Sequence, residues 1–336
     1  MDESITVKRH YDEHALDEWN RLDGFHFEYA VTMAMFSKHL KKGRILDVGG
    51  GPGRYSIALA KEGNAVTLFD LSDGNVTLAL AKAAEAGVTI RALQGDARDL
   101  SMLGNERFDS ILIMGPMYHL FLQKDRRKVL DEARRHLNKN GRIFVSFISL
   151  SGGFNYYLSE DPAAMKDDPA KDYFDCAAND QTWSGDAFTA ATFVDPDEVR
   201  PFLNRAGWNV HTVFGQEGLT GPRLADLEKA SEDVRAFYLD LSLKLCEKPK
   251  YHAYSSHLMA IASPMSSWKR LVMSLQPRLR AFLSHKAFIH LMAVLGLFAL
   301  AGWALESNRW LLWCAALSFG GALCGSFIRR AIQSEK

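Results

Sequence analysis

The chain has 336 residues, and its 40 lysines and arginines are balanced by 40 aspartates and glutamates. This balance excludes the whole-chain positive field that recruits nucleic acid, so we expect no nucleic-acid partner. The length exceeds one average domain without requiring two complete enzymes. The four cysteines have neither CxxC nor Cys/His spacing. We therefore expect no metal site and no disulfide framework, and the composition fits a reducing compartment.

The N-terminal part of the chain is predicted to be helical. Residues 1–14 contain no apolar core, so we expect no signal peptide. Over residues 4–41, apolar side chains recur at helical spacing. The next stretch, Arg44–Ala60, reads RILDVGGGPGRYSIALA, which predicts a strand, a tight turn over residues 49–53 and a helix. Such a unit lets the backbone approach a nucleotide-like ligand at the carboxyl end of the strand.

Strands and helices then alternate. Further strands are predicted at residues 65–70, 88–93, 108–114, 142–148, 208–214 and 256–262, and helices at 75–85, 124–137, 196–206 and 224–246. This alternation predicts an α/β fold with a Rossmann-like, doubly wound sheet, within a domain that covers residues 1–264.

A less regular segment, residues 149–199, interrupts the alternation. We interpret it as an insertion over the carboxyl edge of the sheet, where such folds place the elements that shape a substrate site. It contains eight aromatic residues: Phe154, Tyr156, Tyr157, Tyr173, Phe174, Trp183, Phe188 and Phe193. Two interpretations stay open, a cover for an apolar or aromatic acceptor and a small satellite core.

The glycine turn does not fit a dinucleotide. The pattern G-x-G-x-x-G would place glycine where Arg54 or Ser56 stands. An acid, Asp47, precedes Gly49 by two residues, and a carboxylate repels phosphate but helps to hold an ammonium group. Two further acids, Asp70 and Asp96, close the next two predicted strands and can accept hydrogen bonds from ribose hydroxyls and an adenine amino group. Together they indicate a ligand with a nucleoside and an amino-acid end and no pyrophosphate.

On these stretches the sequence resembles the class I S-adenosylmethionine-dependent methyltransferases of the small-molecule type. The matching segments are ILDVGGGPGRYS, VTLFDLS, GDARDL and FDSILIMGPMYHL, and the resemblance runs from about Tyr11 to about Pro264. It implies a seven-stranded sheet whose last strand is antiparallel, and S-adenosyl-L-methionine as the cofactor. It also implies the cofactor contacts: Asp47, Gly49, Gly50, Gly51 and Gly53 at the methionine end, Asp70 with Leu71 at the ribose, Asp96 with Ala97 at the adenine, Met114 beneath the sulfonium and Tyr11 as a lid.

The methyl group of a sulfonium is electrophilic without help, so a general base is needed only for an acceptor that carries a proton. His119, just past the fourth strand, is the group there whose ordinary pKa lies near neutrality. It either transfers a proton or only bonds the lid and packs beneath the insertion. Tyr118 is a weaker candidate for the same tasks. No Asn-Pro-Pro-Tyr-like sequence follows the fourth strand, which argues against methylation of exocyclic amines.

The C-terminal tail is almost wholly apolar. Ala287–Leu305 and Trp310–Ile328 are 19 residues each, roughly 28 Å of helix, which matches a bilayer core. A basic, amphipathic linker over residues 265–286 and the tail 329–336 flank them, which predicts a transmembrane hairpin with both outer ends, and the catalytic domain, in the cytoplasm. A G-x-x-x-G at Gly321 would let the helices pack closely or let subunits pair into a homo-oligomer. The alternative is a soluble hairpin used for dimerisation.

Our hypothesis is a membrane-anchored enzyme that methylates a small, hydrophobic acceptor at the cytoplasmic face of a membrane, with lipid contacts through residues 287–328. One alternative is a protein methyltransferase that acts on a membrane partner. The other is a non-catalytic module that binds S-adenosylmethionine and signals through the hairpin.

Overall fold

The computed structural model describes residues 3–23, 26–160, 162–163, 168–266 and 268–270. The chain divides into two compact units, Met1–Pro264 and Met265–Lys336, and the elements below belong to the first unit. No helix among the described residues is long and apolar enough to cross a membrane. The predicted hairpin, residues 287–328, lies outside the described residues, so it stays a prediction.

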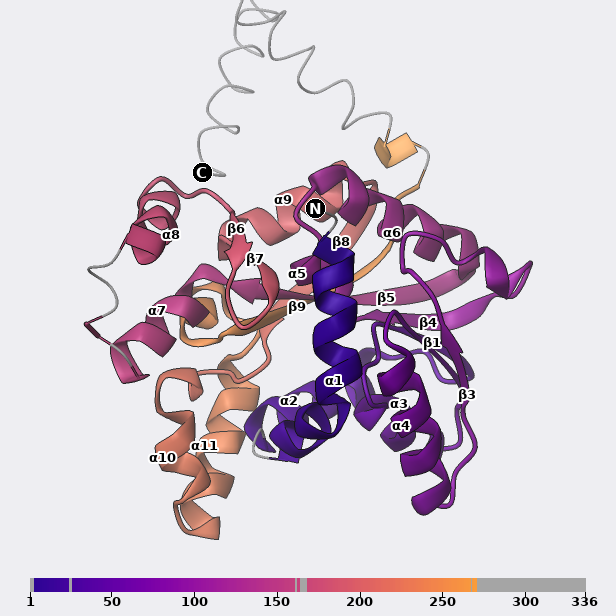
Figure 1. Ribbon diagram of the computed structural model, residues 1–336, viewed down its shortest axis with the longest axis horizontal. Coiled ribbons are helices and arrows are strands. Elements are labelled where there is room, and N and C mark those ends of the chain that lie inside the picture. The colour runs from indigo at the N-terminus through magenta and orange to yellow at the C-terminus, as the bar shows by residue number, and fades with distance from the viewer. Residues whose placement is uncertain (1–2, 24–25, 161, 164–167, 267, 271–336) are drawn as a thin grey trace, which may run out of the picture. The chain divides into compact units, whose positions relative to one another are not determined.

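One mixed sheet forms the centre of the first unit (Figure 1). Its strands are β1 (Arg44–Val48), β2 (Ala65–Asp70), β3 (Arg91–Gln94), β4 (Phe108–Ile113), β5 (Leu137–Ser149), β6 (Trp183–Asp186), β7 (Ala190–Val194), β8 (Trp208–Gly215) and β9 (His257–Pro264). The parallel order is β3-β2-β1-β4-β5, and β9 lies antiparallel between β5 and β8. The last strand therefore runs antiparallel to both of its neighbours, as predicted.

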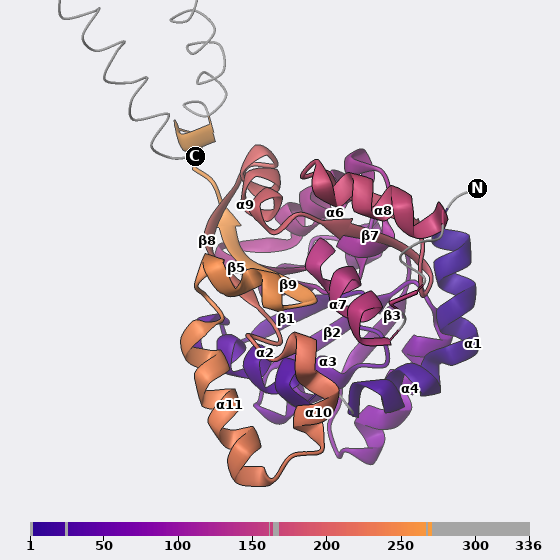
Figure 2. The ribbon, with the colours of Figure 1, turned by 90° about the vertical axis from the view of Figure 1, so that its left-hand side faces the viewer.

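Helices cover both faces of the sheet. They are α1 (Glu3–Asp23), α2 (His26–His39), α3 (Arg54–Lys61), α4 (Asp73–Glu85), α5 (Pro116–His119), α6 (Gln123–His136), α7 (Leu150–Glu160), α8 (Asp168–Ala178), α9 (Pro196–Arg205), α10 (Leu224–Glu228) and α11 (Glu232–Leu245). Among the described residues, three short 3₁₀ helices lie in the connections: η1 (Ser101–Leu103) between β3 and β4, η3 (Gly221–Arg223) before α10, and η4 (Pro249–Tyr254) before β9. α11 contacts α2, and α10 and α11 lie on the same side of the unit (Figure 2).

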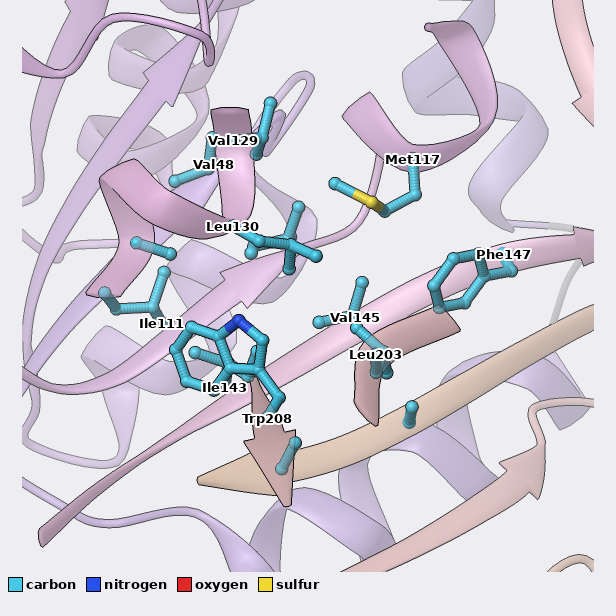
Figure 3. Close-up of a cluster of buried hydrophobic side chains, with 14 of the residues drawn as sticks. Val48, Ile111, Met117, Val129, Leu130, Ile143, Val145, Phe147, Leu203 and Trp208 are labelled. Carbon is cyan, nitrogen blue, oxygen red and sulfur yellow. The ribbon is translucent and has the colours of Figure 1, made fainter. Parts of the chain in front are cut away.

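The apolar strands split their side chains between two buried clusters, because successive side chains of a strand point to opposite faces. On β4, Ile111 and Ile113 join the cluster beneath α6 and α9, while Leu112 joins the cluster beneath α2, α3 and α4. Figure 3 shows the first cluster, where Trp208 of β8 lies near Ile143 of β5. Both faces of the sheet are thus buried, which explains why the central strands have continuous apolar sequences.

Three features differ from the sequence-based expectation. β3 starts at Arg91 rather than at residue 88, and the four-residue helix α5 was not predicted. The insertion is more regular than its sequence indicated, because it holds α7, α8 and the hairpin β6–β7. β7 pairs in parallel with the end of β5, at Ile148↔Phe193, so within the described residues the sheet has nine strands instead of seven.

The aromatic residues of the insertion form a satellite core. Tyr173 is 3% exposed and contacts the rings of Phe154, Trp183 and Phe193 edge-on or tilted. These rings pack on Ile148 at the end of β5. Most of the aromatic residues therefore form a satellite core, whereas Tyr156 and Phe188 are exposed.

Candidate active site

The glycine turn after β1 has a left-handed backbone. Gly49, Gly51 and Gly53 have φ of +73°, +56° and +87°, a region that glycine adopts without strain. Gly49 also lies against the start of α5, since a Cβ added to it would stand 2.6 Å from Cδ of Pro116. By contrast, a Cβ on Gly51 would meet no protein atom within 4 Å. The turn therefore leaves open space in front of Gly51.

Asp47 lies beneath this turn and is 1% exposed. Its Oδ2 accepts a hydrogen bond of 2.7 Å from the Ser56 hydroxyl at the start of α3. Burial raises the pKa of Asp47 to about 6, the Ser56 hydrogen bond opposes this shift, and the nearby negative charge of Asp70 adds to it. Burial thus keeps the carboxyl of Asp47 protonated to a higher pH than that of an ordinary aspartate.

Asp70 connects the end of β2 to the glycine turn. Its Oδ2 accepts the Gly51 N–H at 2.8 Å, and its Oδ1 accepts the Ser72 N–H at 2.9 Å and the Asn75 side chain at 3.2 Å. Burial raises the pKa of Asp70, and these hydrogen bonds lower it again. Since a carboxylate has about four acceptor positions, the group retains capacity for a ligand hydroxyl.

At the end of β3, Asp96 is paired with a cation. The Arg98 guanidinium donates to both Asp96 oxygens, and it also donates to the Ser4 hydroxyl on α1 at 2.8 Å. Asp96 and its neighbour Ala97 line the same cleft as Leu71, which follows Asp70. The three acids predicted from the ends of β1, β2 and β3 therefore face one space.

α1 crosses in front of the sheet and closes this space (Figure 1). Asp12 accepts hydrogen bonds from the Ser72 hydroxyl at 2.7 Å and from the Gly74 N–H at 3.3 Å. Tyr11, one residue earlier, lies with its hydroxyl 3.1 Å from Nε2 of His119. The N-terminal helix is therefore bonded to the protein on both sides of the cleft, as a lid requires.

His119 is held at both ring nitrogens. Nδ1 lies 2.9 Å from the carbonyl oxygen of Ala190, which can only accept, so Nδ1 carries the proton and Nε2 accepts from Tyr11. Burial lowers the pKa of His119 to about 4, although the hydrogen bond to Ala190 opposes that shift. In its neutral form, His119 therefore accepts the hydrogen bond from Tyr11 of α1. A role in proton transfer would require that Tyr11 first leave Nε2.

The cleft lies at the edge of the sheet where β1, β2 and β3 end. Ten of the eleven predicted cofactor residues line it: Tyr11, Asp47, Gly49, Gly50, Gly51, Asp70, Leu71, Asp96, Ala97 and Met114. The exception is Gly53, which caps α3 and packs against Ala79 of α4. We call the side formed by Asp47, Gly51 and Asp70 the cofactor wall.

A second group of side chains, which we call the acceptor wall, consists of Glu28, Ser146 and His257, which line the cleft, and Glu217, which bonds His257. None of these four was predicted. Ligand atoms of Glu28, Glu217 and His257 lie within 4.8 Å of one another, close enough to hold a metal ion. However, Nδ1 of His257 is 2.7 Å from Oε1 of Glu217, which is a hydrogen bond rather than the wider spacing of two ligands about one ion.

The cofactor wall fits S-adenosylmethionine. The space before Gly51 admits the ligand close to the backbone, Asp70 offers acceptors for hydroxyls, and the buried carboxyl of Asp47 faces a region where an ammonium group would balance its charge. Tyr11 and His119 then shield this region from water.

Comparisons with known proteins agree with this geometry. The sequence profile of a family described as "Methyltransferase domain" matches residues 45–141. The glycine/sarcosine N-methyltransferase of Aphanothece halophytica is 30% identical over 147 residues, which cover 43% of this chain and 56% of that enzyme. Among solved structures, the magnesium protoporphyrin IX methyltransferase of Synechocystis PCC 6803 superposes with a TM-score of 0.48 at 14% identity, over 79% of this chain and 100% of that one. A likeness at that level carries no argument about function.

The chain spans about half the length of the first curated relatives, 56% and 54% for two glycine/sarcosine N-methyltransferases. A longer match is found with the ubiquinone biosynthesis O-methyltransferase of Pseudomonas syringae, which is 30% identical over 209 residues, or 60% of this chain and 78% of that enzyme. Together with the matched profile, the length of this alignment places the chain in the class I S-adenosylmethionine-dependent methyltransferases.

Proposed function

We propose that the protein transfers the methyl group of S-adenosylmethionine to a hydroxyl of a small, hydrophobic acceptor, at the cytoplasmic face of a membrane that its C-terminal hairpin enters. The observation that carries the transfer is the cleft itself. It has a cofactor wall at the ends of β1 and β2, a lid from α1, and a separate acceptor wall in the same space.

Two kinds of relative support different acceptor atoms. One group is named for N-methylation of glycine and sarcosine, and the other for O-methylation in ubiquinone biosynthesis. The second group includes a relative that is matched over 78% of its length. The acceptor wall also supports a hydroxyl, because its histidine and carboxylates can accept a proton from one.

The hydrophobic character of the acceptor rests on the tail. Two apolar stretches of 19 residues with basic outer flanks have the length and charge pattern of membrane helices. Attachment would raise the local concentration of a membrane-dissolved acceptor at the mouth of the cleft. Tyr156 and Leu158 on α7 are 60% and 64% exposed, so the insertion also offers apolar surface to such a molecule.

The transfer is tested by incubating the purified full chain with methyl-labelled S-adenosylmethionine and, separately, lipid extract, soluble extract and sarcosine. We expect the label in a compound of the lipid extract, in an ether bond that survives mild base. Label found in sarcosine or in protein would contradict the proposed acceptor. Cofactor binding without transfer to any fraction would support the non-catalytic alternative.

The membrane attachment is tested by cell fractionation. We expect the full chain in the membrane pellet after a high-salt wash, and a chain that ends at Pro264 in the supernatant. A full chain that remains in the supernatant, or that is released by salt alone, would contradict the hairpin.

A further inference from the structure

Three side chains that no sequence motif indicated meet at the acceptor wall. His257 is the first residue of β9. Because β9 runs antiparallel to β5, it begins at the edge where the parallel strands end (Figure 2). Glu217 follows the end of β8, and Glu28 lies in the first turn of α2. The fold therefore brings an imidazole and two carboxylates to the edge that also carries the glycine turn.

Glu217 forms two hydrogen bonds with His257. Its Oε2 accepts the backbone N–H of His257 at 3.1 Å, and its Oε1 lies 2.7 Å from Nδ1 of the ring. A carboxylate only accepts hydrogen bonds, so Nδ1 carries the ring proton and Nε2 is the basic nitrogen. The pair has the geometry of a histidine whose tautomer and orientation are fixed by an acid.

The surroundings stabilise a positive charge on that ring. In addition to the contact with Glu217, Nδ1 of His257 lies 3.8 Å from Oε2 of Glu28. Glu28 and Glu217 are 8% and 2% exposed, so their charges are poorly screened by water. Two buried carboxylates next to one imidazole favour the imidazolium form.

Three further side chains of the same cleft, Tyr118, Ser146 and Tyr55, carry hydroxyl groups and no charge at neutral pH. Tyr118 of α5 has its ring centroid 6.3 Å from the His257 ring, and its hydroxyl donates to the carbonyl oxygen of Met114. Ser146 of β5 lies in the same cleft, and its hydroxyl donates to Gln216 at 2.5 Å. Burial raises the pKa of Tyr55 well above its ordinary range, and the negative charge of Glu28 adds to that shift.

The position suits a proton transfer. His257, Tyr118 and Met114 line one cleft, and Met114 follows β4, which places it at the same sheet edge as the glycine turn. An acceptor bound in this part of the cleft would lie beside His257. The second histidine of the cleft, His119, has both nitrogens bonded and its pKa lowered to about 4, so it is a poor proton acceptor at neutral pH.

We propose that His257 is the catalytic base of the methyl transfer, that Glu217 is its positioning residue, and that Glu28 stabilises the imidazolium that forms. This inference rests on the proposed function. The acceptor hydroxyl gives its proton to Nε2 of His257 while its oxygen attacks the methyl carbon. The S–CH₃ bond breaks, its electron pair stays on sulfur, and the products are the methyl ether, S-adenosylhomocysteine and an imidazolium that later releases its proton to water.

The test uses the full chain in detergent and, as probe, a catechol that carries an alkyl chain, with the lipid extract as a second acceptor source. We would measure the transfer rate between pH 5.5 and 9 and the affinity for S-adenosylmethionine by calorimetry. His257→Gln should lower the rate by about 10²- to 10⁴-fold and remove its rise with pH, with cofactor affinity changed less than twofold. His211→Gln, an exposed histidine of β8 that bonds Ser263, is the matched control and should leave rate and affinity unchanged.

Variants of Glu217 distinguish a residue that positions His257 for catalysis from one that only stabilises the fold. Glu217→Gln should lower kcat more than KM and move the acidic limb of the pH profile to lower pH, because the imidazolium loses a counter-charge. Glu217→Asp should restore part of the rate and move the acidic limb of the pH profile back toward its wild-type position. If His257→Gln does not bind the cofactor because it has misfolded, the two Glu217 variants test the proposal in its place.

Each outcome counts. Unchanged rate and pH profile in His257→Gln or Glu217→Gln, with an active wild type, would overturn the base and leave the proposed function intact. A wild type that binds the cofactor but methylates no acceptor would overturn both. A wild-type rate that falls with EDTA and returns with Mn²⁺ or Zn²⁺ would show that the three side chains hold a metal instead.

Discussion

The two walls of the cleft are built by different means. On the cofactor wall, hydrogen bonds join groups within one strand–helix–strand unit: Asp70 accepts the N–H groups of Gly51 and Ser72, and Asp47 accepts the Ser56 hydroxyl. On the acceptor wall, side chains bond to each other between distant segments, as Glu217 and His257 do from the ends of β8 and β9. The first arrangement depends on backbone shape, and the second depends on the register of β8 and β9.

This difference predicts which property a substitution on each wall should change. Changes on the cofactor wall should alter cofactor affinity, whereas changes on the acceptor wall should alter the transfer rate and spare that affinity.

Gly51→Ala should weaken S-adenosylmethionine binding at least 100-fold. The new Cβ would project into the space that the cofactor needs, and φ of +56° disfavours any side chain by about 1–2 kcal/mol. Isothermal calorimetry on the full chain measures the change.

Gly87→Ala is the matched control for the strain alone. Gly87 has φ of +70° and an equally empty surround, but it lies in the turn after α4 and not in the cleft. We expect a loss of stability of about 1 kcal/mol in urea denaturation, with unchanged affinity. An equal loss of affinity in both variants would mean that strain, not contact, governs the cofactor wall.

Asp70→Asn should weaken cofactor binding about 30-fold. The amide cannot accept at both atoms the hydrogen bonds that now come from Gly51, Ser72 and Asn75, and a charged hydrogen bond contributes about 1.5–3 kcal/mol. Because the Asp70 charge raises the pKa of Asp47, the variant should also lower the pH at which Asp47 titrates. An affinity within twofold of the wild type would remove Asp70 from the site.

Sequence reasoning reached the cofactor wall because its parts are local. Asp47, the glycines and Asp70 lie within one strand–helix–strand unit, where each residue type has a backbone reason for its place. It could not reach His257 and Glu217, since 40 residues separate them and nothing in either segment reveals the register of β8 and β9. A histidine at the start of an otherwise apolar strand was the available signal.

The fold follows the same rule. The central strands were predicted from their apolar runs, whereas the hairpin β6–β7 was missed. β6 contains Gly185 and alternates between partly buried and exposed side chains, and its partner β7 is held by two register pairs at the end of β5. Tertiary pairing, not local propensity, makes these strands.

Asp47→Asn should make cofactor affinity less dependent on pH. Burial raises the pKa of Asp47 to about 6, so in the wild type the charge that attracts the cationic cofactor develops as pH rises through 6. We expect wild-type affinity to rise up to tenfold between pH 5 and 7, and the variant's affinity to stay flat. A variant with the wild-type slope would assign the titration to another group.

The stability of the cofactor-free protein should move the other way. In the unfolded chain Asp47 ionises near 3.8, so between pH 3.8 and 6 the folded protein keeps a proton that the unfolded chain loses, and stability falls as pH rises through that window. Above pH 6 the full penalty, about 3 kcal/mol, applies, and Asp47→Asn should relieve part of it at pH 8 but none near pH 4. Urea denaturation at the two pH values measures this.

The smallest effect concerns the lid, which joins the two walls. Tyr11→Phe removes the hydrogen bond to Nε2 of His119, about 1 kcal/mol, so amide exchange in α1 should quicken about fivefold at pH 7.5. The pKa of His119 is lowered to about 4 in the folded protein, so between pH 6.5 and 4 the closed lid is progressively disfavoured against an open form that binds the proton. The wild type should therefore approach the variant as the pH falls through this window, while Tyr254→Phe, at an exposed tyrosine of η4, should match the wild type throughout. Wild-type exchange that shows no such approach, once corrected for the intrinsic pH dependence, would mean that Tyr11 and His119 do not hold the lid.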